Sequence, residues 1–253
     1  MAFDKHCQIF TQAEIESLRK GGAILRDCLK FVSAMVSPGI TTMMLDQAAE
    51  AFIRSKGGKP AFLGYFGFTG TLCTSVNEEV VHGIPRKDKV LKAGDIISLD
   101  GGVIYDDLYT DACVTVGVGQ IAPDVREFLT YTSDTLENVI QEIVRAGAQV
   151  GDISSFIEKA LKKNGYSAVR TLTGHGLGTT LHQFPDVPNV GKAGTGPLLP
   201  VGTMIAIEPI ATMRSPEVYT ADDGWTVITK DGCMSCHFEH SVLLTESGPE
   251  IIA

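Results

Sequence analysis

Two aspartates interrupt apolar, strand-like runs in the segment LDGGVIYDDLYTDA. Asp100 ends the run DIISLD and Asp111 lies within LYTDACVTV. Asp106 and Asp107 instead occupy the place of a turn, where water solvates them. A four-residue loop ending at Asp107 would place Asp100 directly opposite Asp111 on one face of a hairpin. Partly buried carboxylates at that spacing repel each other unless they share a proton or hold a cation between them.

The strand that carries Asp100 has an acidic counterpart in the second half of the chain. Glu208 follows the apolar run MIAI in GTMIAIEP, as Asp100 follows IISL in GDIISLD, at a shift of 108 positions. The same shift carries Gly39 onto Gly147. This agreement predicts two structurally related halves. An acid at the same place in both halves favours a functional site over a satisfied residue at a strand edge.

The second half supplies further candidate ligands. The Gly-rich segment TLTGHGLGTTLH contains His175 and His182, and Glu239 precedes an apolar strand. A proton shared between two aspartates accounts for none of these residues, so a cation is favoured. Four carboxylates and one imidazole are enough for two divalent metal ions about 3.5–4 Å apart. The candidate ligands are Asp100, Asp111, His175, Glu208 and Glu239.

These ligands indicate hydrolytic chemistry. Two metal ions lower the pKa of a water between them and polarise a carbonyl oxygen. Nearby histidines can donate a proton to the leaving group and hydrogen bonds to the tetrahedral oxyanion. His182 and His82, the latter in EEVVHGIP, are the candidates for these roles.

The elements that must position these residues follow one pattern twice, two helices and then strands. We expect helices over 11–33, 42–55, 122–146 and 153–163, and strands over 60–68, 71–81, 95–104 and 108–118. The expected fold class is α/β (α+β), in which two pseudo-symmetric halves form one curved antiparallel sheet with helices outside and the site between them. We expect a single catalytic domain over 1–253, with repeats of about 11–120 and 121–253.

Composition excludes several other classes of protein. The formal charge of −9 and the pI near 5.1 argue against direct nucleic-acid binding. No apolar run approaches the length of a membrane span, and the start MAFDKHCQIF lacks the pattern of a signal peptide. The six cysteines are scattered, and Cys233 and Cys236 form a lone CxxC that favours packing thiols. We therefore expect a cytoplasmic protein.

The motifs in combination resemble a known family. SVNEEVVHGIP, GDIISLDGGV, LYTDA, GHGLG, IAIEP, DGWTV and FEHSV are similar, in order and spacing, to those of bacterial-type type I methionine aminopeptidases. The resemblance covers nearly the whole chain and implies the pita-bread fold. It also implies removal of the initiator methionine from nascent polypeptides, with preference for a small second residue and with water activated by two divalent ions (Mn, Fe, Co or Zn). Among the five ligands, it implies that Asp111 and Glu239 bridge the two ions.

The resemblance also implies roles for individual residues. Glu208 acts as acid and base, while His182 contacts the scissile carbonyl and His82 lies near the cleaved amide. The residues implied for the methionine pocket are Tyr65, Phe68, Cys73, Leu181, Trp225 and Phe238. Asn77 and Ser235 match a monovalent-cation site. The chain departs from many relatives along the pocket wall and the nearby loop, at Phe62, Phe68, Thr179, Thr180 and Leu181.

Other functions stay open at this point. An Xaa-Pro aminopeptidase or prolidase would share the fold, an inactive relative would serve as a binding protein, and the ligand types alone would suit a dinuclear phosphatase. Intact ligands oppose the inactive relative, and the absence of basic residues in the site motifs opposes the phosphatase. The expected partners are N-termini of nascent chains, with docking at the ribosome left open. We expect a monomer that contacts no membrane.

Overall fold

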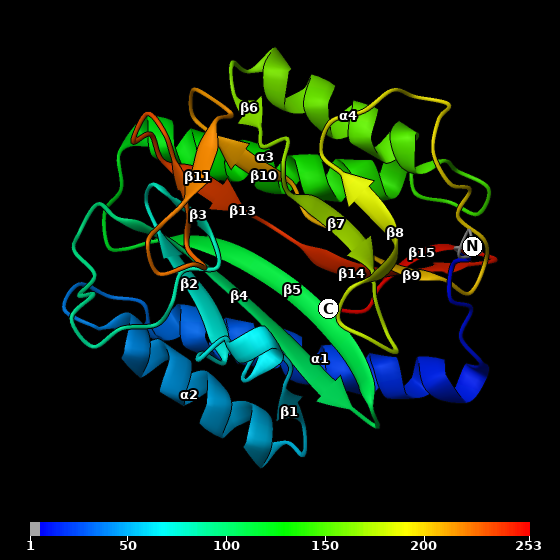
Figure 1. Ribbon diagram of the computed structural model, residues 1–253, viewed down its shortest axis with the longest axis horizontal. Helices are drawn as coiled ribbons and strands as arrows, with labels where there is room; N and C mark the ends of the chain where they lie inside the picture. Colours follow the sequence, from blue (N-terminus) through cyan, green and yellow to red (C-terminus); the bar gives the residue numbers. More distant parts are fainter. Residues whose placement is uncertain (1–5) are drawn as a thin grey trace.

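Two pairs of helices lie outside a layer of strands (Figure 1). The computed structural model describes residues 6–253, so part of the N-terminal stretch MAFDKHCQIF lies outside the described residues. One pair packs on the strands of the first half of the chain and the other on those of the second half. The α-helices are α1 Gln12–Met35, α2 Thr42–Ser55, α3 Pro123–Glu142 and α4 Val150–Lys163. None of the helices within 6–253 is both long and apolar enough to cross a membrane.

The local sequence explains where α1 begins and which face it buries. Thr11 Oγ1 accepts the N–H of Glu14, and the Glu14 carboxylate accepts the N–H of Thr11. This is the capping box that the sequence predicted. Leu18 lies on the buried face of the helix. A β-carbon at Gly22 would collide with the carbonyl of Ile252, so only glycine lets the end of the chain pack against α1.

The two halves correspond at the shift of 108 residues found in the sequence. The bounds of α2 map onto those of α4 without adjustment. The isolated bridge between Thr41 and Val90 likewise maps onto the bridge between Gln149 and Leu198. Because this match includes pairs that are distant in the chain, tertiary structure is repeated as well as sequence. The last helix was predicted to begin at residue 153, but α4 begins at Val150. Its N-cap is Gln149, which precedes the apolar run on which the prediction was based.

Within residues 6–253, the strands form four antiparallel groups. In the first half, β4 (Ile96–Tyr105) pairs on one edge with β1 (Lys59–Pro60) and β2 (Leu72–Val76) and on the other with β5 (Leu108–Gly117). In the second half, one group is β13 (Ser235–His237), β10 (Ile210–Thr212) and β6 (Ser167–Ala168). The largest group runs β15 (Gly248–Ile251), β14 (His240–Thr245), β9 (Met204–Ile207), β7 (Thr173–Gly176) and β8 (Gln183–Pro188). The last joins both halves through β11 (Val218–Thr220), β12 (Val227–Thr229) and β3 (Glu79–Val81).

The predicted register of the β4–β5 hairpin is wrong by two residues. The loop is the two-residue turn 106–107, with φ of 49° and 61°, and not a four-residue loop. Asp100 therefore pairs with Cys113, and Asp111 pairs with Gly102. The two carboxylates are diagonal neighbours on one face and are not directly opposed. Positive φ at both turn residues gives a type I′ turn, whose twist matches that of the flanking strands and so permits the shorter loop.

Two further predicted strands are interrupted by residues with positive φ. In the stretch predicted as 60–68, only Pro60 belongs to a strand, the two-residue β1, and the 3₁₀ turn η1 (Tyr65–Gly67) follows. Phe66 in that turn has φ of 46° and cannot continue a strand. The predicted strand 71–81 is divided into β2 and β3 by a turn at Asn77, with φ of 57°.

The two halves meet along β5 and the segment that carries Glu239. Cys113 and Glu239 exchange two backbone hydrogen bonds, of 3.3 and 3.0 Å. Ser241 Oγ accepts the N–H of Asp111 at 2.9 Å and donates to its carbonyl at 2.7 Å. On the other side of this bridge, Thr115 Oγ1 likewise accepts the N–H of His237 and donates to the carbonyl of His237. Hydroxyl groups thus extend the strand ladder across the boundary and fix the position of the acids of one half relative to the other.

Candidate metal centre and substrate pocket

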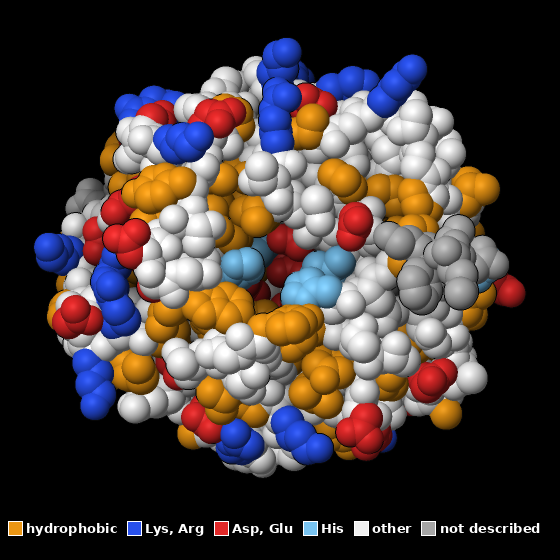
Figure 2. Space-filling model, in the orientation of Figure 1, with side chains coloured by type: hydrophobic (Ala, Val, Ile, Leu, Met, Phe, Trp, Pro, Cys, Tyr) orange, Lys and Arg blue, Asp and Glu red, His pale blue; other side chains and the backbone are white. Residues whose placement is uncertain are grey.

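A cavity of about 290 Å³ opens between the two halves of the molecule. Figure 2 shows histidine and acidic side chains inside a central hollow, with hydrophobic side chains around its mouth. Both halves contribute acids to its lining. The structure brings all five candidate ligands into this cavity: Asp100, Asp111, His175, Glu208 and Glu239.

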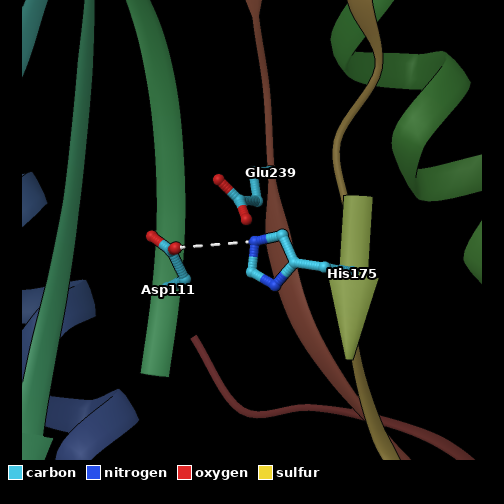
Figure 3. Close-up of side chains that lie close together, drawn as sticks. All are labelled: Asp111, His175 and Glu239. Carbon is cyan, nitrogen blue, oxygen red and sulfur yellow. Dashed lines mark ion pairs between the residues drawn. The ribbon is translucent and has the colours of Figure 1, made fainter. Parts of the chain in front are cut away.

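Three of these side chains point toward one another from different elements (Figure 3). Asp111 lies on β5, His175 on β7, and Glu239 in the gap between β13 and β14. One ligand atom from each lies within 4.8 Å of the other two. His175 Nε2 is 3.9 Å from Asp111 Oδ2, and all three side chains are buried. This grouping suits a single metal ion.

The acids of the cavity lack the hydrogen bonds that buried carboxylates need. Oδ1 of Asp100, Oδ1 of Asp111 and Oε1 of Glu239 have no hydrogen-bond partner. Burial raises the pKa of Asp100 to about 7. Burial, and to a smaller extent the neighbouring carboxylates, raises the pKa of both Asp111 and Glu239 well above the usual range. Cations among these groups would favour their ionised forms, so the residues present fit bound divalent metal ions.

Glu208 and Glu239 occupy breaks in their strands. β9 ends before Glu208 and β10 begins after Pro209, which has no N–H to donate to a ladder. The pairing of Ile207 with His240 on one side of the break and of Ile210 with His237 on the other keeps one register, so Glu208 and Glu239 oppose each other. The directly opposed pair of acids that the sequence suggested for the first half therefore occurs in the second.

His175 is oriented by its own strand. Its Nδ1 lies 3.0 Å from the carbonyl oxygen of Gly176, so this nitrogen donates and Nε2 faces the carboxylates with its lone pair free. A β-carbon at Gly174 would approach the Ala206 carbonyl to 2.4 Å, and one at Gly176 would approach the Phe184 carbonyl to 2.3 Å. The glycines of this segment thus let β7 fit closely between β9 and β8.

His237 is a buried histidine of the cavity that the sequence reasoning missed. Its Nε2 lies 3.3 Å from Glu208 Oε2 and 3.6 Å from Glu239 Oε2. Burial acts to lower the pKa of His237, but the carboxylates of Glu208 and Asp100 outweigh it and raise the pKa. The signal in the sequence was its position two residues before Glu239, since alternate residues of a strand share a face.

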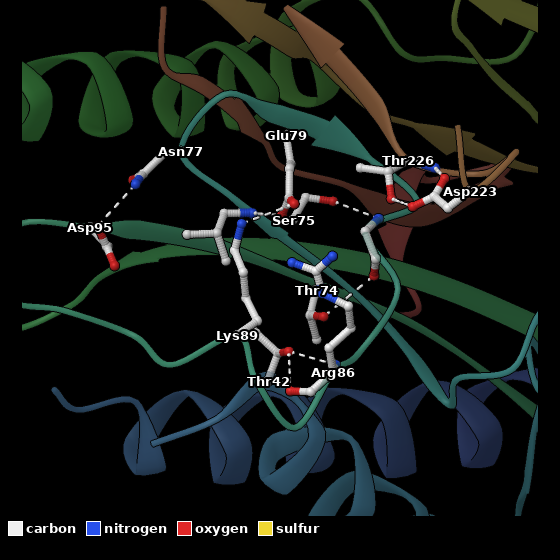
Figure 4. Close-up of polar contacts among 12 residues, drawn as sticks. Thr42, Thr74, Ser75, Asn77, Glu79, Arg86, Lys89, Asp95, Asp223 and Thr226 are labelled. Carbon is white, nitrogen blue, oxygen red and sulfur yellow. Dashed lines mark hydrogen bonds and ion pairs between the residues drawn. The ribbon is translucent and has the colours of Figure 1, made fainter. Parts of the chain in front are cut away.

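His82 follows β3, and the loop after it is held by hydrogen bonds to Thr74 and Ser75 of β2 (Figure 4). His82 has φ of 59°, and the next residue, Gly83, is hydrogen-bonded to β2. The Gly83 carbonyl accepts hydrogen bonds from the N–H and hydroxyl of Thr74, and its N–H donates to Ser75 Oγ. A β-carbon at Gly83 would lie 2.5 Å from the Thr74 carbonyl. These contacts fix His82 at the cavity, where burial lowers its pKa.

His182 also lines the cavity, beside His175, and is hydrogen-bonded to Tyr65 of the pocket wall. Tyr65 Oη is 3.0 Å from His182 Nδ1, and the ring centroids of His182 and His175 are 4.3 Å apart. Burial, and to a smaller extent the nearby His175, lowers the pKa of His182 to about 4. His182 is therefore a neutral hydrogen-bonding group near pH 7.

The apolar part of the cavity contains most of the residues implied for the methionine pocket. Phe68 and Trp225 meet edge to face, with centroids 5.1 Å apart. Phe238 does not line the cavity, because it follows His237 in the extended segment between β13 and β14 and packs in the core under α3 and α4 instead. The pocket therefore excludes it. The implied residues that do line the cavity are Tyr65, Phe68, Cys73, Leu181 and Trp225, and Phe62 joins them.

Asn77 and Ser235 lie together beside the site. The N–H of Ser235 donates to the carbonyl of Asn77 at 2.8 Å. The Asn77 side chain donates to Asp95 and accepts the N–H of Ile96. The two residues implied for a monovalent cation are thus neighbours across β13 and the β2–β3 turn.

Comparisons with known proteins agree with this geometry. Residues 16–246 match metallopeptidase family M24. A methionine aminopeptidase of Clostridium perfringens is 43% identical over 94% of this chain and 95% of its own length. A crystal structure of methionine aminopeptidase from Thermotoga maritima superposes with a TM-score of 0.96 at 40% identity, covering 98% of this chain and 99% of that one.

A prolidase from Pyrococcus furiosus shares the fold at greater distance. Its TM-score is 0.79 at 22% identity, and the match covers 96% of this chain but 64% of the prolidase. The predicted pita-bread fold, with pseudo-symmetric halves and an antiparallel sheet, is confirmed by these structures. The full-length similarity lies with the aminopeptidases, so the Xaa-Pro alternative is not favoured.

Proposed function

The chain belongs to metallopeptidase family M24 and, within it, to the methionine aminopeptidases, and from this premise we propose how its cavity removes the N-terminal methionine from polypeptides. The observation that carries the proposal is the group of buried, unpaired carboxylate oxygens beside an apolar pocket. Such oxygens suit divalent metal ions, and the pocket suits an unbranched thioether side chain.

We infer that two divalent ions are held by the five predicted ligands, with Asp111 and Glu239 shared between them. When bound, the ions supply Lewis acidity, which activates a water and polarises the scissile carbonyl. Oxygen donors with imidazole leave Mn²⁺, Fe²⁺, Co²⁺ and Zn²⁺ as candidates. The monovalent cation near Asn77 and Ser235 is part of the same proposal, and the short contact between these residues supports it.

The chain's own side chains move protons and orient the substrate. Glu208 accepts the proton of the attacking water and passes it to the leaving amine. His182 donates from Nε2 to the scissile carbonyl oxygen, which requires Nδ1 to accept from the Tyr65 hydroxyl. Because its pKa is about 4, His182 does this as a neutral donor over the physiological range. His82 is held in place beside β2 and contacts the scissile amide from there.

The aromatic and sulfur-containing wall of the pocket supports selection of methionine. Phe68, Trp225 and Cys73 surround a space that a branched side chain fills less well. Preference for a small second residue follows from the family and is tested with the same assay. The substrates are N-termini of nascent polypeptides, and we include docking at the ribosome in the proposal.

We further propose a cytoplasmic monomer consisting of one catalytic domain with the repeats 11–120 and 121–253. All six cysteines are free thiols, which suits a reducing compartment. Light scattering tests the monomer, and co-sedimentation with ribosomes tests the docking.

The decisive experiment measures methionine release. Protein supplied with Mn²⁺, Co²⁺ or Fe²⁺ should cleave Met-Ala- and Met-Gly-initiated peptides and lose this activity after chelation. Leu-initiated peptides test the pocket, because equal cleavage of Leu and Met would refute the assignment of its walls. Ala-Pro peptides test the Xaa-Pro alternative, which predicts their cleavage in preference to Met-Ala peptides.

A further inference from the structure

His237 is a second imidazole at the metal centre, outside the five predicted ligands. It lies on β13 two residues before Glu239, so its ring and the Glu239 carboxylate project from the same face of the sheet. It lines the cavity and is only 2% exposed. Neither ring nitrogen makes a hydrogen bond of good geometry, although Glu208 Oε2 lies only 3.3 Å from Nε2. A buried imidazole in this state has a nitrogen that can bind a ligand beyond its protein neighbours.

The distances around Nε2 suit a common metal ion. Nε2 of His237 is 3.3 Å from Glu208 Oε2 and 3.6 Å from Glu239 Oε2. Two ligand atoms that are each about 2.1 Å from one ion lie about 3.0–3.4 Å apart at bond angles of about 90–109°. The two observed spacings are close to this range, and small side-chain rotations would meet it.

Two overlapping groups of ligand atoms each contain one histidine. One group contains Asp111, His175 and Glu239, and the other contains Glu208, His237 and Glu239. Glu239 belongs to both groups, and Glu208 Oε1 also lies 3.9 Å from His175 Nε2, so these two carboxylates stand between the two positions. Each position includes one imidazole, whereas the five predicted ligands include one imidazole in all.

We propose that His237 binds the second metal ion through Nε2, together with Glu208 and Glu239. This proposal rests on the proposed function and deepens it, because it assigns a nitrogen ligand to each of the two ions. Imidazole favours Fe²⁺, Co²⁺ and Zn²⁺ over ions that prefer oxygen alone, such as Mg²⁺. The second position of this enzyme should therefore select borderline metals more strongly than an oxygen-only position would.

X-ray absorption spectroscopy on the wild-type protein tests the proposal without any substitution. Chelated protein is loaded with two equivalents of Co²⁺, and imidazole scattering per ion is counted. One imidazole per ion is expected, and one imidazole for every two ions would overturn the assignment. If the protein binds no Co²⁺ at all, the proposed function itself fails, so the two failures are distinguishable.

The variant His237→Gln separates metal binding from hydrogen bonding. Its amide can still donate to Glu208 but supplies no imidazole. By calorimetric titration with Co²⁺, we expect one ion to bind as in wild type and the second to bind more weakly by over about 100-fold, beyond the range typical of partners outside the ligand sphere. Two ions bound at unchanged affinity would overturn the proposal.

His240→Gln is the matched control. His240 follows Glu239 directly, but its ring nitrogens lie 2.7 Å from the Ala253 carbonyl and 3.2 Å from the Glu137 carboxylate, and it does not line the cavity. Its titration should match that of the wild type. A loss equal to that of His237→Gln would attribute the effect to general disturbance of this segment and would overturn the proposal.

Discussion

The strands that carry the acids are built differently in the two halves of the molecule. In the first half, Asp100 and Asp111 lie inside β4 and β5, which run for ten residues each without interruption. In the second half, Glu208 and Glu239 lie in gaps that divide the corresponding strands into β9 and β10 and into β13 and β14. Two equivalent hairpins thus present the same type of ligand, one from a continuous ladder and one from a broken ladder.

The ends of the two hairpins differ in size as well. The first closes in the solvated turn 106–107, whereas the segment 213–234 separates β10 from β13. That segment contains β11 and β12, which pair with β3, and it brings Trp225 to the pocket. The expanded end of the second hairpin therefore adds Trp225 to a pocket whose other aromatic walls, Tyr65 and Phe68, come from the first half.

The largest expected effect comes from the continuous ladder. Asp111→Asn keeps the shape of the side chain but removes the charge that we assign to both ions. Release of methionine should fall by more than about 100-fold, the upper range for residues that only support a ligand. Asp106→Asn, on the same hairpin but in the solvated turn, should change the activity by less than about twofold. Comparable losses in both variants would show that the hairpin as a whole, and not its inner face, matters.

The pH dependence of stability tests the charge on this centre. An acid with a raised pKa holds a proton in the folded state that the unfolded chain has released, so stability falls as pH rises from the unfolded to the folded pKa. For Asp100, with a folded pKa of about 7, this window runs from about pH 4 to 7. Asp111 and Glu239, also raised, extend it upward.

The measurement is denaturant unfolding of chelated protein at pH 5 and pH 8. Stability should be lower at pH 8 by on the order of 3 kcal/mol from Asp100 alone. Metal-loaded protein should lack this decline, because the cations favour ionised carboxylates. An equal profile with and without metal would mean that the acids already have partners in the protein.

Local signals made the helices and the ligands predictable. Thr11 and Glu14 announce a capping box, and each acid stands out because it ends or interrupts an apolar run. The register of the hairpin was not predictable from this alternation, because a shift of two residues keeps every side chain on the same face. Only the turn chemistry of Asp106 and Asp107 distinguishes the two possibilities, since both residues tolerate positive φ.

The broken strands of the second half were harder to foresee. Pro209 signals the break after Glu208, but the gap at Glu239 depends on pairing across the boundary between the halves. His237 could have been found by its spacing from Glu239. The assignment of Phe238 to the pocket overlooked the same alternation, because neighbouring residues on a strand face opposite sides.

The boundary between the halves supplies a smaller, structural test. Ser241→Ala removes the hydroxyl that bonds both the N–H and the carbonyl of Asp111, leaving two buried groups unpaired. The free energy of unfolding should fall by about 1–3 kcal/mol. Ser247→Ala, in the exposed turn before β15, should change it by less than about 0.5 kcal/mol. Chemical denaturation of both variants makes the comparison, and equal stabilities would mean that the boundary does not depend on this hydroxyl.

The smallest expected effect lies at the turn of the continuous hairpin and tests its register. Asp107 has φ of 61°, so Asp107→Gly should stabilise the protein by about 0.5 kcal/mol, because glycine adopts positive φ without a steric penalty. Asp107→Ala should destabilise it, since alanine lacks both that freedom and the polar side chain. Denaturant midpoints would order the variants as Gly, Asp and then Ala, with methionine release unchanged in all three. Alanine at least as stable as glycine would argue for negative φ at this position, as in the four-residue loop, and would return Asp100 and Asp111 to direct opposition.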